Sequence, residues 1–314
     1  MSKMSAVKNG VKYLFVAVAL ALLAWAVWQQ RFSVAEGLSR LGGTAVSVAL
    51  VSGAGAALLN ALSWRASYRA MGAELPLLEA MRVFLISQIG KYLPGSVWPV
   101  VTQIEMSRRH GISRSQAATA SIVSMLVGTL TAALASLLIF VADSGTLLSQ
   151  YWPVLVAVPL IITVIYPPVL NRLLRLISRY FRRYECVEVV DFSALVQSCL
   201  WSGVMWVAFG IHFHVLVNGL SEVPVSFAHS VGTFALAWVA GFLFIIAPAG
   251  VGVREAVFVI ALGDAIGAPQ ALTVAVLSRA LLTVIDAVGV ALAGLVPMLV
   301  SPTHAKKAKG DYSG

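Results

Sequence analysis

Charged residues are scarce in this sequence. Only 11% of its 314 residues are charged and 59% are hydrophobic, whereas an ordinary soluble domain carries about 25% charged residues. Cysteine is rare too, because Cys186 and Cys199 are the only two. That number supports neither a disulfide framework nor a cysteine-based zinc site. The composition is typical of an integral membrane protein.

Common enzyme motifs are also missing. The sequence contains no P-loop, HExxH motif, dinucleotide-binding fingerprint or nucleophile elbow. His212 and His214 are two positions apart in an apolar stretch, so they face different sides of a helix and suit the membrane interface better than a metal site. We therefore expect no catalytic motif, no cofactor and no metal ion.

The net charge of +9 does not indicate nucleic-acid binding. A nucleic-acid surface needs basic residues among exposed polar and aromatic ones. Here the basic residues lie in short loops beside apolar segments, as in the cytoplasmic loops of membrane proteins. The largest basic cluster forms an amphipathic run over residues 172–183, which we expect on the inner leaflet. The charge distribution predicts that both termini face the cytoplasm.

Six stretches have the length and apolar character of a full bilayer crossing, which needs about 20 residues. They are residues 12–29, 41–64, 116–141, 152–171, 194–217 and 270–299. The first resembles a signal peptide but lacks small residues for cleavage, so we expect an uncleaved helix. The pattern predicts one all-α membrane domain over residues 1–302 and a basic cytoplasmic tail over 303–314.

Two further apolar stretches, residues 76–107 and 226–263, are too long for one crossing and are interrupted by proline and glycine. Both flanks of the first are basic, so its chain is expected to enter the membrane and return to the same side. In lipid, a broken backbone must be buried in protein or face water. Each stretch is therefore predicted to be a re-entrant broken-helix hairpin.

The two hairpins belong to a predicted internal repeat. Shifting the chain by 154 residues places Pro94 on Pro248 and aligns the two Gln-Ala-x-Thr sequences that open the following helices. The repeat units, about 41–141 and 195–295, would begin on opposite sides of the membrane. Inverted repeats of this kind are common in secondary transporters, which bind substrate where the broken helices meet.

The first hairpin is interrupted at Lys91, Pro94 and Gly95. The half-helix after the break would present free N–H groups at its positive end, which favours an anion. Lys91 would add a positive charge to that site, or its side chain would reach the cytoplasmic surface instead. Three more side chains of this hairpin could serve either packing or a pocket: Trp98, Gln103 and Glu105.

The second break contains two glycines and two adjacent charged residues, Gly250, Gly252, Arg254 and Glu255. Arginine in the first turn of a half-helix can bind a phosphate or carboxylate through two hydrogen bonds. In the next helix, Arg279 and Asp286 are seven positions apart and share one face. With Glu255 they could form a structural ion-pair network, or the three could lie on a substrate path.

The sequences GKYLPGxxW at residues 90–98 and APAGVGVRE at residues 247–255 carry a family resemblance. They resemble the lysylphosphatidylglycerol synthase transmembrane family, whose flippase-like members are related to the lipid-flipping half of the multiple peptide resistance factor. The resemblance covers about residues 12–299 and implies translocation of a lipid in the prokaryotic cytoplasmic membrane. It also implies binding roles for Lys91, Pro94, Gly95, Trp98, Arg254 and Glu255.

Three functions are compatible with these observations. The expected one is a flippase-like transporter of a phosphate-containing or glycosylated lipid. A second is a non-transporting partner that holds a polyprenyl-phosphate-linked lipid for a membrane glycosyltransferase. A third is a membrane lipid transferase using Glu105, Glu255 or Asp286 as a base, although no donor or acceptor motif favours it. Aminoacyl-lipid synthesis is not expected, because the sequence contains no soluble aminoacyl-transfer domain.

Overall fold

The structure is a computed structural model, described for residues 31–93, 97–143, 159, 163–164, 166–180, 189, 191–244 and 250–299. The predicted helix at 12–29, most of the predicted helix at 152–171 and the tail at 303–314 lie outside these residues. Every regular element in the described part is helical, as predicted for an all-α protein.

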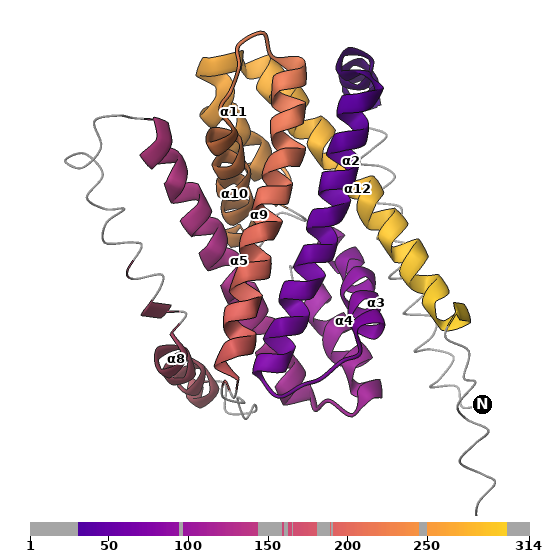
Figure 1. Cartoon of the computed structure of the whole chain (residues 1–314), viewed down its shortest axis with the longest axis vertical. Helices are drawn as coiled ribbons and strands as arrows, with labels where there is room; N and C mark the ends of the chain where they lie inside the picture. Colours follow the sequence, from indigo (N-terminus) through magenta and orange to yellow (C-terminus); the bar gives the residue numbers. More distant parts are fainter. Residues whose placement is uncertain are drawn as a thin grey trace, which may run out of the picture.

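Four long helices form the frame of the molecule (Figure 1). They are α2 (Arg31–Ala70), α5 (Arg114–Asp143), α9 (Phe192–Leu220) and α12 (Ala268–Leu299). In the described part, each contains a segment long and apolar enough to cross a membrane. A helix suits that environment because it satisfies its own backbone hydrogen bonds. These four helices correspond to the predicted ones at 41–64, 116–141, 194–217 and 270–299.

Two pairs of shorter helices lie among the long ones. The first pair is α3 (Leu77–Ser87) and α4 (Trp98–Ser107), with the 3₁₀ turn η1 (Gln88–Tyr92) after α3. The second pair is α10 (Phe227–Leu243) and α11 (Val253–Ile266). In Figure 1, α3 and α4 occupy the lower half of the molecule, whereas α10 and α11 occupy the upper half. The two predicted hairpin regions therefore lie at opposite ends.

The first pair is tightly folded on itself at Gly90. A Cβ atom at this position would lie 2.7 Å from the backbone nitrogen of Pro99, so no side chain fits there. Leu93 has the extended angles φ −93° and ψ 145°, which the following proline favours. Pro99 stands in the first turn of α4, where its missing N–H costs no helical hydrogen bond.

Helices α2 and α9 pack closely along their length and are joined by buried serines. The hydroxyl of Ser198 on α9 lies 2.8 Å from the hydroxyl of Ser67 on α2. It also donates to the carbonyl oxygen of Ser63 at 2.8 Å. Small hydroxyl residues let membrane helices approach closely and hydrogen-bond across the interface. This contact holds two of the four long helices of the frame together.

Two apolar clusters fill the space between the helices. In the upper cluster, Phe213 of α9 stacks on Phe258 of α11 with ring centroids 4.5 Å apart. In the lower cluster, Trp64 and Tyr68 of α2 are fully buried with ring centroids 4.0 Å apart. Each helix pair thus packs against its own cluster, and the region between them is left for polar residues.

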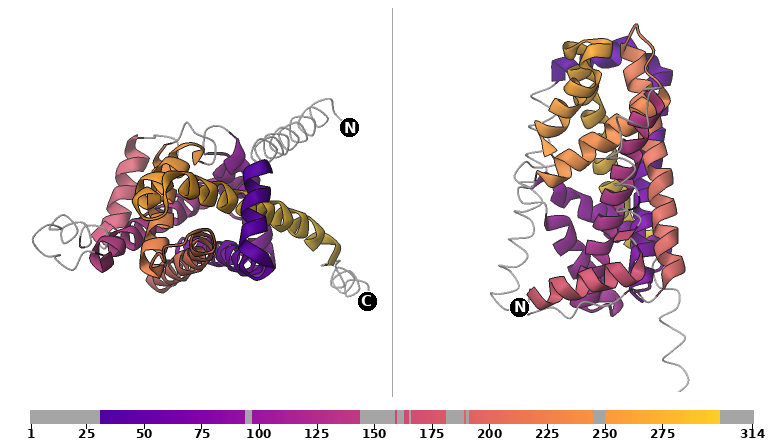
Figure 2. Two further views of the ribbon diagram at one scale, coloured as in Figure 1. Left: turned by 90° about the horizontal axis from the view of Figure 1, so that it is seen from above. Right: turned by 90° about the vertical axis from the view of Figure 1, so that its left-hand side faces the viewer.

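Helix α8 (Pro167–Tyr180) lies across the lower end of the long helices rather than along them (Figures 1 and 2). Its Leu170 and Leu174 are buried against the lower cluster, while Arg172 and Arg175 are exposed. This is the arrangement expected of an amphipathic helix at a membrane surface. The predicted amphipathic run therefore begins within a helix of that kind.

Candidate functional site

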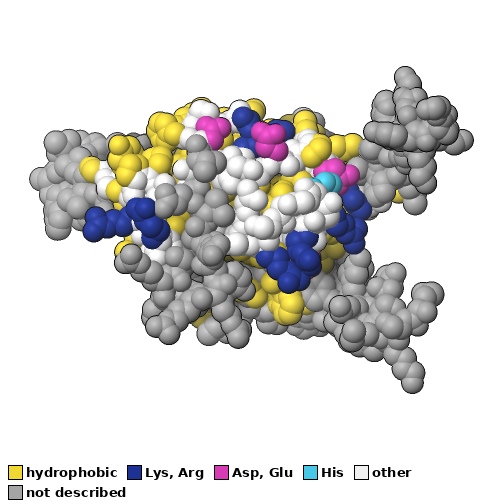
Figure 3. All heavy atoms as spheres, turned by 90° about the horizontal axis from the view of Figure 1, so that it is seen from below, with side chains coloured by type: hydrophobic (Ala, Val, Ile, Leu, Met, Phe, Trp, Pro, Cys, Tyr) yellow, Lys and Arg dark blue, Asp and Glu magenta, His cyan; other side chains and the backbone are white. Residues whose placement is uncertain are grey.

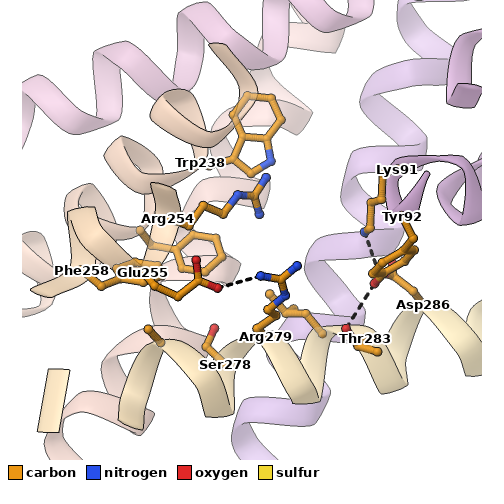
Figure 4. A pocket seen from close by; sticks show the side chains of 13 residues that line it. Lys91, Tyr92, Trp238, Arg254, Glu255, Phe258, Ser278, Arg279, Thr283 and Asp286 are labelled. Carbon is orange, nitrogen blue, oxygen red and sulfur yellow. Dashed lines mark hydrogen bonds and ion pairs between the residues drawn. The ribbon is translucent and has the colours of Figure 1, made fainter. Parts of the chain in front are cut away.

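A small pocket of about 70 Å³ lies where η1, α10, α11 and α12 meet (Figure 4). Its polar lining comes from three segments of the sequence. Lys91 and Tyr92 come from η1, and Arg254 and Glu255 come from the first turn of α11. Helix α12 supplies the other polar residues, Ser278, Arg279, Thr283 and Asp286.

On one side of the pocket, Lys91 is paired with Asp286. Its ammonium nitrogen lies 2.6 Å from the Asp286 carboxylate, and the Tyr92 hydroxyl donates to the same oxygen at 2.5 Å. The Tyr92 oxygen also lies 3.3 Å from the hydroxyl of Thr283. Charged groups at membrane depth need such partners. The first helix pair is thereby tied to α12.

On the other side, Arg279 is paired with Glu255. The guanidinium donates to the Glu255 carboxylate at 2.7 Å, and both side chains are largely buried. The second carboxylate oxygen accepts from the backbone N–H of Gly252 at 2.7 Å, which caps the start of α11. Gly252 has φ 81°, a left-handed angle that suits glycine. Glu255 therefore closes a helix end and binds a cation at once.

Arg254 is the exception to this pairing. It makes no hydrogen bond or ion pair within the described part of the chain, and its Nε atom is buried without a partner. Figure 4 shows its side chain extending from α11 between Trp238 and Arg279. Room for it is made by Gly241 and Gly250, because Cβ atoms there would lie 2.7 Å and 3.0 Å from Nε.

A larger cavity of about 230 Å³ adjoins the small pocket and shares Lys91, Arg254 and Asp286 with it. It is lined by residues of α2, α3, α4, α5, α9, α10 and α12 as well. Its volume is far above the ~30 Å³ that one water molecule takes in the liquid. Both helix pairs therefore contribute to one cavity of mixed polar and apolar lining inside a membrane-type fold.

The structure brings most of the predicted binding residues to these cavities. Those in the lining of one or both are Lys91, Gln103, Gly250, Arg254, Glu255, Arg279 and Asp286. Gln103 is buried and donates to the Ser87 hydroxyl at 3.1 Å. Their joint position is what a binding site between the two breaks requires.

Other predicted residues lie elsewhere. Trp98 is 39% exposed and is not in the lining. Glu105 is exposed and pairs with Arg108 and Arg114 on the lower surface. Gly252 caps α11 outside the cavity lining. Three residues of the breaks lie outside the described part: Pro94, Gly95 and Pro248.

The ionic contacts differ from the network considered from the sequence. Arg279 and Asp286 share a face of α12, yet each binds a different partner. Lys91 reaches Asp286 instead of the cytoplasmic surface, with 36% of its side chain exposed. Two separate ion pairs therefore flank the unpaired Arg254.

Several lining residues were not anticipated. Tyr92 lies within the GKYLPG sequence, and its place in that motif could have indicated it. Thr283 lies one helical turn before Asp286 on α12, and this spacing could have indicated that both face the pocket. The aromatic wall formed by Trp238 gave no such signal, because tryptophan is common in apolar helices. Side-chain packing alone brings that ring to the pocket.

His212 does not extend to lipid or water, contrary to what is expected of an interfacial side chain. Its side chain is completely buried between α2, α9 and α12. One ring nitrogen lies 2.8 Å from the carbonyl oxygen of Ala49, which can only accept, so Nδ1 carries the proton. The other nitrogen lies 2.9 Å from the hydroxyl of Ser278. His212 is therefore a structural link behind the pocket wall.

The family model for the transmembrane region of lysylphosphatidylglycerol synthase matches residues 13–289. The chain belongs to this family. It is thus a multi-pass membrane protein of a family associated with lipid handling, as the two motif sequences predicted. No individual curated protein matches the chain significantly.

In this member of the lysylphosphatidylglycerol synthase transmembrane family, the charges that line the pocket determine which ligands it can bind. Two cations are neutralised by two carboxylates, and the guanidinium of Arg254 is left over. A buried guanidinium without a counter-charge is a strong binding group for a phosphate or carboxylate. The arrangement is suited to an anion delivered into the cavity.

Proposed function

We propose that this protein moves a lipid with a phosphate-containing or glycosylated headgroup across the cytoplasmic membrane. The observation that carries the proposal is the unpaired Arg254 in a cavity lined by both helix pairs. The headgroup would occupy that cavity while its acyl or prenyl tails stay in the bilayer. In this scheme the protein is a transporter, with no chemical step on the lipid.

The proposal includes the inverted arrangement. The two breaks would open the cavity toward opposite leaflets, within a frame of about six crossings and two re-entrant hairpins. The positions of α3 and α4 below and α10 and α11 above support this geometry. Lys91 and Arg254 would then hold the phosphate in turn, from the first and second hairpin respectively.

The orientation in the membrane is proposed from charge. Exposed arginines gather at the lower end of the molecule (Figure 3), namely Arg108, Arg109, Arg114, Arg172 and Arg175. The loop after α9 and the last turn of α11, at the other end, carry the acidic residues Glu222 and Asp264. By the positive-inside rule the lower end would face the cytoplasm, and we propose that both termini face it as well.

In the proposed cycle, Lys91 exchanges its partner Asp286 for the lipid phosphate. In the structure this carboxylate neutralises Lys91. A lipid phosphate bound at Arg254 could replace Asp286 beside Lys91, because a phosphate oxygen is also a strong acceptor. Movement of the anion between the two cations would carry the headgroup from one hairpin toward the other.

Translocation in proteoliposomes tests the proposal. Arg254→Ala and Lys91→Ala should each lower the translocation rate of fluorescent phosphatidylglycerol at least tenfold, while Arg254→Lys keeps part of the activity. The control is Arg109→Ala, which removes an exposed arginine far from the cavity lining. Melting temperature in detergent reports whether each variant folds. Unchanged rates in both cavity variants would refute the proposal.

Lipid binding without translocation would have a different meaning. If purified protein retained a lipid but moved none, the cavity would serve as a holding site for a partner such as a membrane glycosyltransferase. Co-purification with such an enzyme would then be expected. Mass spectrometry of the lipids that accompany the purified protein identifies the bound class in either case.

A further inference from the structure

The larger cavity is chemically divided. Its charged groups are gathered at the side shared with the small pocket, where Lys91, Arg254 and Asp286 lie. Beyond them, toward α2, α4 and α5, the lining carries amides, hydroxyls, aromatic rings and apolar side chains such as Val100 and Met125, but no charged side chain. We call this part of the lining the neutral compartment. It is defined by Asn60, Trp64, Gln88, Gln103, Ser121 and Ser124.

Three polar groups of the neutral compartment have unused hydrogen-bonding capacity. Within the described part of the chain, the side chains of Asn60, Gln88 and Ser124 have no hydrogen-bond partner, although all three are partly buried. The Gln103 amide nitrogen is used by Ser87, which leaves its carbonyl oxygen available. Partly buried amides in a membrane protein require a polar partner. The compartment is therefore built to hold a polar group.

Aromatic rings complete the compartment. Trp64 is 1% exposed, and its indole N–H is buried without a partner. Phe84 and Trp206 line the same cavity. Rigid rings that offer apolar faces beside amides and hydroxyls suit a ligand with C–H faces and hydroxyl edges. Polyols and sugars have that character.

The charge balance disfavours a cationic headgroup. The charged residues that line the larger cavity are Lys91, Arg254 and Asp286, which sum to one net positive charge (two minus one). Asp286 is already engaged by Lys91 and Tyr92. An ammonium group would meet no free carboxylate there and would be repelled in a medium of low dielectric constant. Only an anion with a neutral substituent satisfies both parts of the cavity.

We propose that the cavity selects a lipid whose phosphate binds at Arg254 and carries an uncharged, hydroxyl-bearing substituent in the neutral compartment. This inference rests on the proposed function and narrows its substrate to a polyol or sugar phospholipid. A phospholipid with an aminoacyl or ethanolamine headgroup would be a poor substrate. The contacts of Gln88, Asn60 and Ser124 with hydroxyl groups would supply the preference.

The test compares four fluorescent probes in the same proteoliposomes. Phosphatidylglycerol and phosphatidylinositol carry neutral hydroxylated substituents, phosphatidic acid carries none, and phosphatidylethanolamine carries an ammonium group. Wild-type protein should move the first two at least tenfold faster than the others. Gln88→Leu should lower their rates to about that of phosphatidic acid, so that the preference for hydroxylated substituents is lost. The matched control, Gln197→Leu, alters an exposed amide that contacts Arg69 on the surface.

A second variant keeps the inference testable if Gln88→Leu fails to fold. Gln88→Glu preserves the size of the side chain and gives the cavity a carboxylate that can pair with an ammonium group. This variant should therefore shift the preference toward phosphatidylethanolamine. Binding is measured separately, by quenching of tryptophan fluorescence in detergent with each lipid. Selective binding without movement would support the neutral compartment and refute transport. Equal rates and equal binding for all four lipids, or no effect of either variant, would overturn the compartment while leaving transport intact.

Discussion

The side chain of Arg254 has its position because two glycines leave room for it. At Gly241 on α10, a Cβ atom would lie 2.7 Å from both Cγ and Nε of Arg254. Gly250, just before α11, has φ 71° and also lies against this side chain. The Arg254 side chain can therefore occupy this position only because neither glycine carries a side chain.

From this packing we expect Gly241→Ala to have a large effect on activity and a small effect on stability. Gly241→Ala should displace the guanidinium and lower phosphatidylglycerol translocation about tenfold, equivalent to ~1.4 kcal/mol. Its effect on stability should be small, because alanine favours a helix over glycine by up to ~1 kcal/mol and offsets the strain. Translocation in proteoliposomes and the melting temperature in detergent measure the two effects.

The matched control for Gly241→Ala is Gly203→Ala in α9. A Cβ atom at Gly203 meets nothing within 4 Å, so this variant should be at least as stable as wild type and fully active. If both alanine variants transport normally, the close contact at Gly241 does not position Arg254.

The sequence indicated which charged residues lie within apolar segments, but not which of them form ion pairs. Arg254 and Lys91 stand next to breaks in apolar stretches, and burial of charge is readable from that context. The pairing of Lys91 with Asp286 joins residues almost 200 positions apart, and helical spacing is informative only within one helix. The contacts of His212 were not predicted for the same reason, since its neighbours come from α2 and α12.

Among the elements, α9 has a well-defined start. The Asp191 carboxylate accepts from the backbone N–H of Ala194 at 3.1 Å and from the Ser193 hydroxyl at 2.7 Å. The Asp191 backbone N–H donates to the carbonyl of Ala70 at the end of α2. The hydrogen bonds from Ser193 and Ala194 to the carboxylate, the Ser193 hydroxyl first, lower the pKa of Asp191 below its ordinary value of 3.8. The charged form is therefore favoured in the folded protein.

A lowered pKa in the folded state predicts a specific pH dependence. The ionised Asp191 adds stability above the unfolded-state value near 3.8, and this contribution disappears as the pH falls through the lower folded-state pKa. Asp191→Asn keeps a capping acceptor but does not titrate. The melting-temperature difference between wild type and Asp191→Asn in detergent should be constant near neutral pH and shrink toward zero below about pH 4. A difference independent of pH would contradict the assignment.

Element positions were largely readable from the sequence, whereas their ends were not. Hydropathy located α5, α9 and α12 within a few residues of the predicted spans. Helix α2 spans Arg31 to Ala70, beyond the predicted 41–64, but the chain is kinked at Gly42, where φ 71° and ψ 160° are not helical. Its long unbroken part therefore begins close to the predicted start and extends six residues past the predicted end. The role of Gly90 was missed, since its need for space depends on the approach of Pro99.

For the whole molecule, the arrangement of the two helix pairs links fold to function. Each pair packs at its own end, and the cavity lies where residues from both meet. The 154-residue shift predicted two equivalent hairpins from Pro94 and Pro248, and family membership was predicted from the motifs at the same breaks. The inverted repeat itself, the total of six crossings and the orientation stay predictions. Charge asymmetry between the ends is the physical reason to expect one orientation.

Accessibility from the two sides of the membrane tests that orientation. Single cysteines are introduced by Arg109→Cys at the lower end and by Val223→Cys in the exposed loop between α9 and α10, after Cys186→Ser and Cys199→Ala remove the native thiols. An impermeant maleimide should label only the Val223→Cys variant in intact spheroplasts and only the Arg109→Cys variant in inverted vesicles, because the arginine-rich end stays in the cytoplasm. Labelling of both in detergent confirms that each thiol is reactive. If both variants react from the same side, the ends of the molecule do not face opposite compartments, and a cavity that opens alternately to the two leaflets through these hairpins is ruled out.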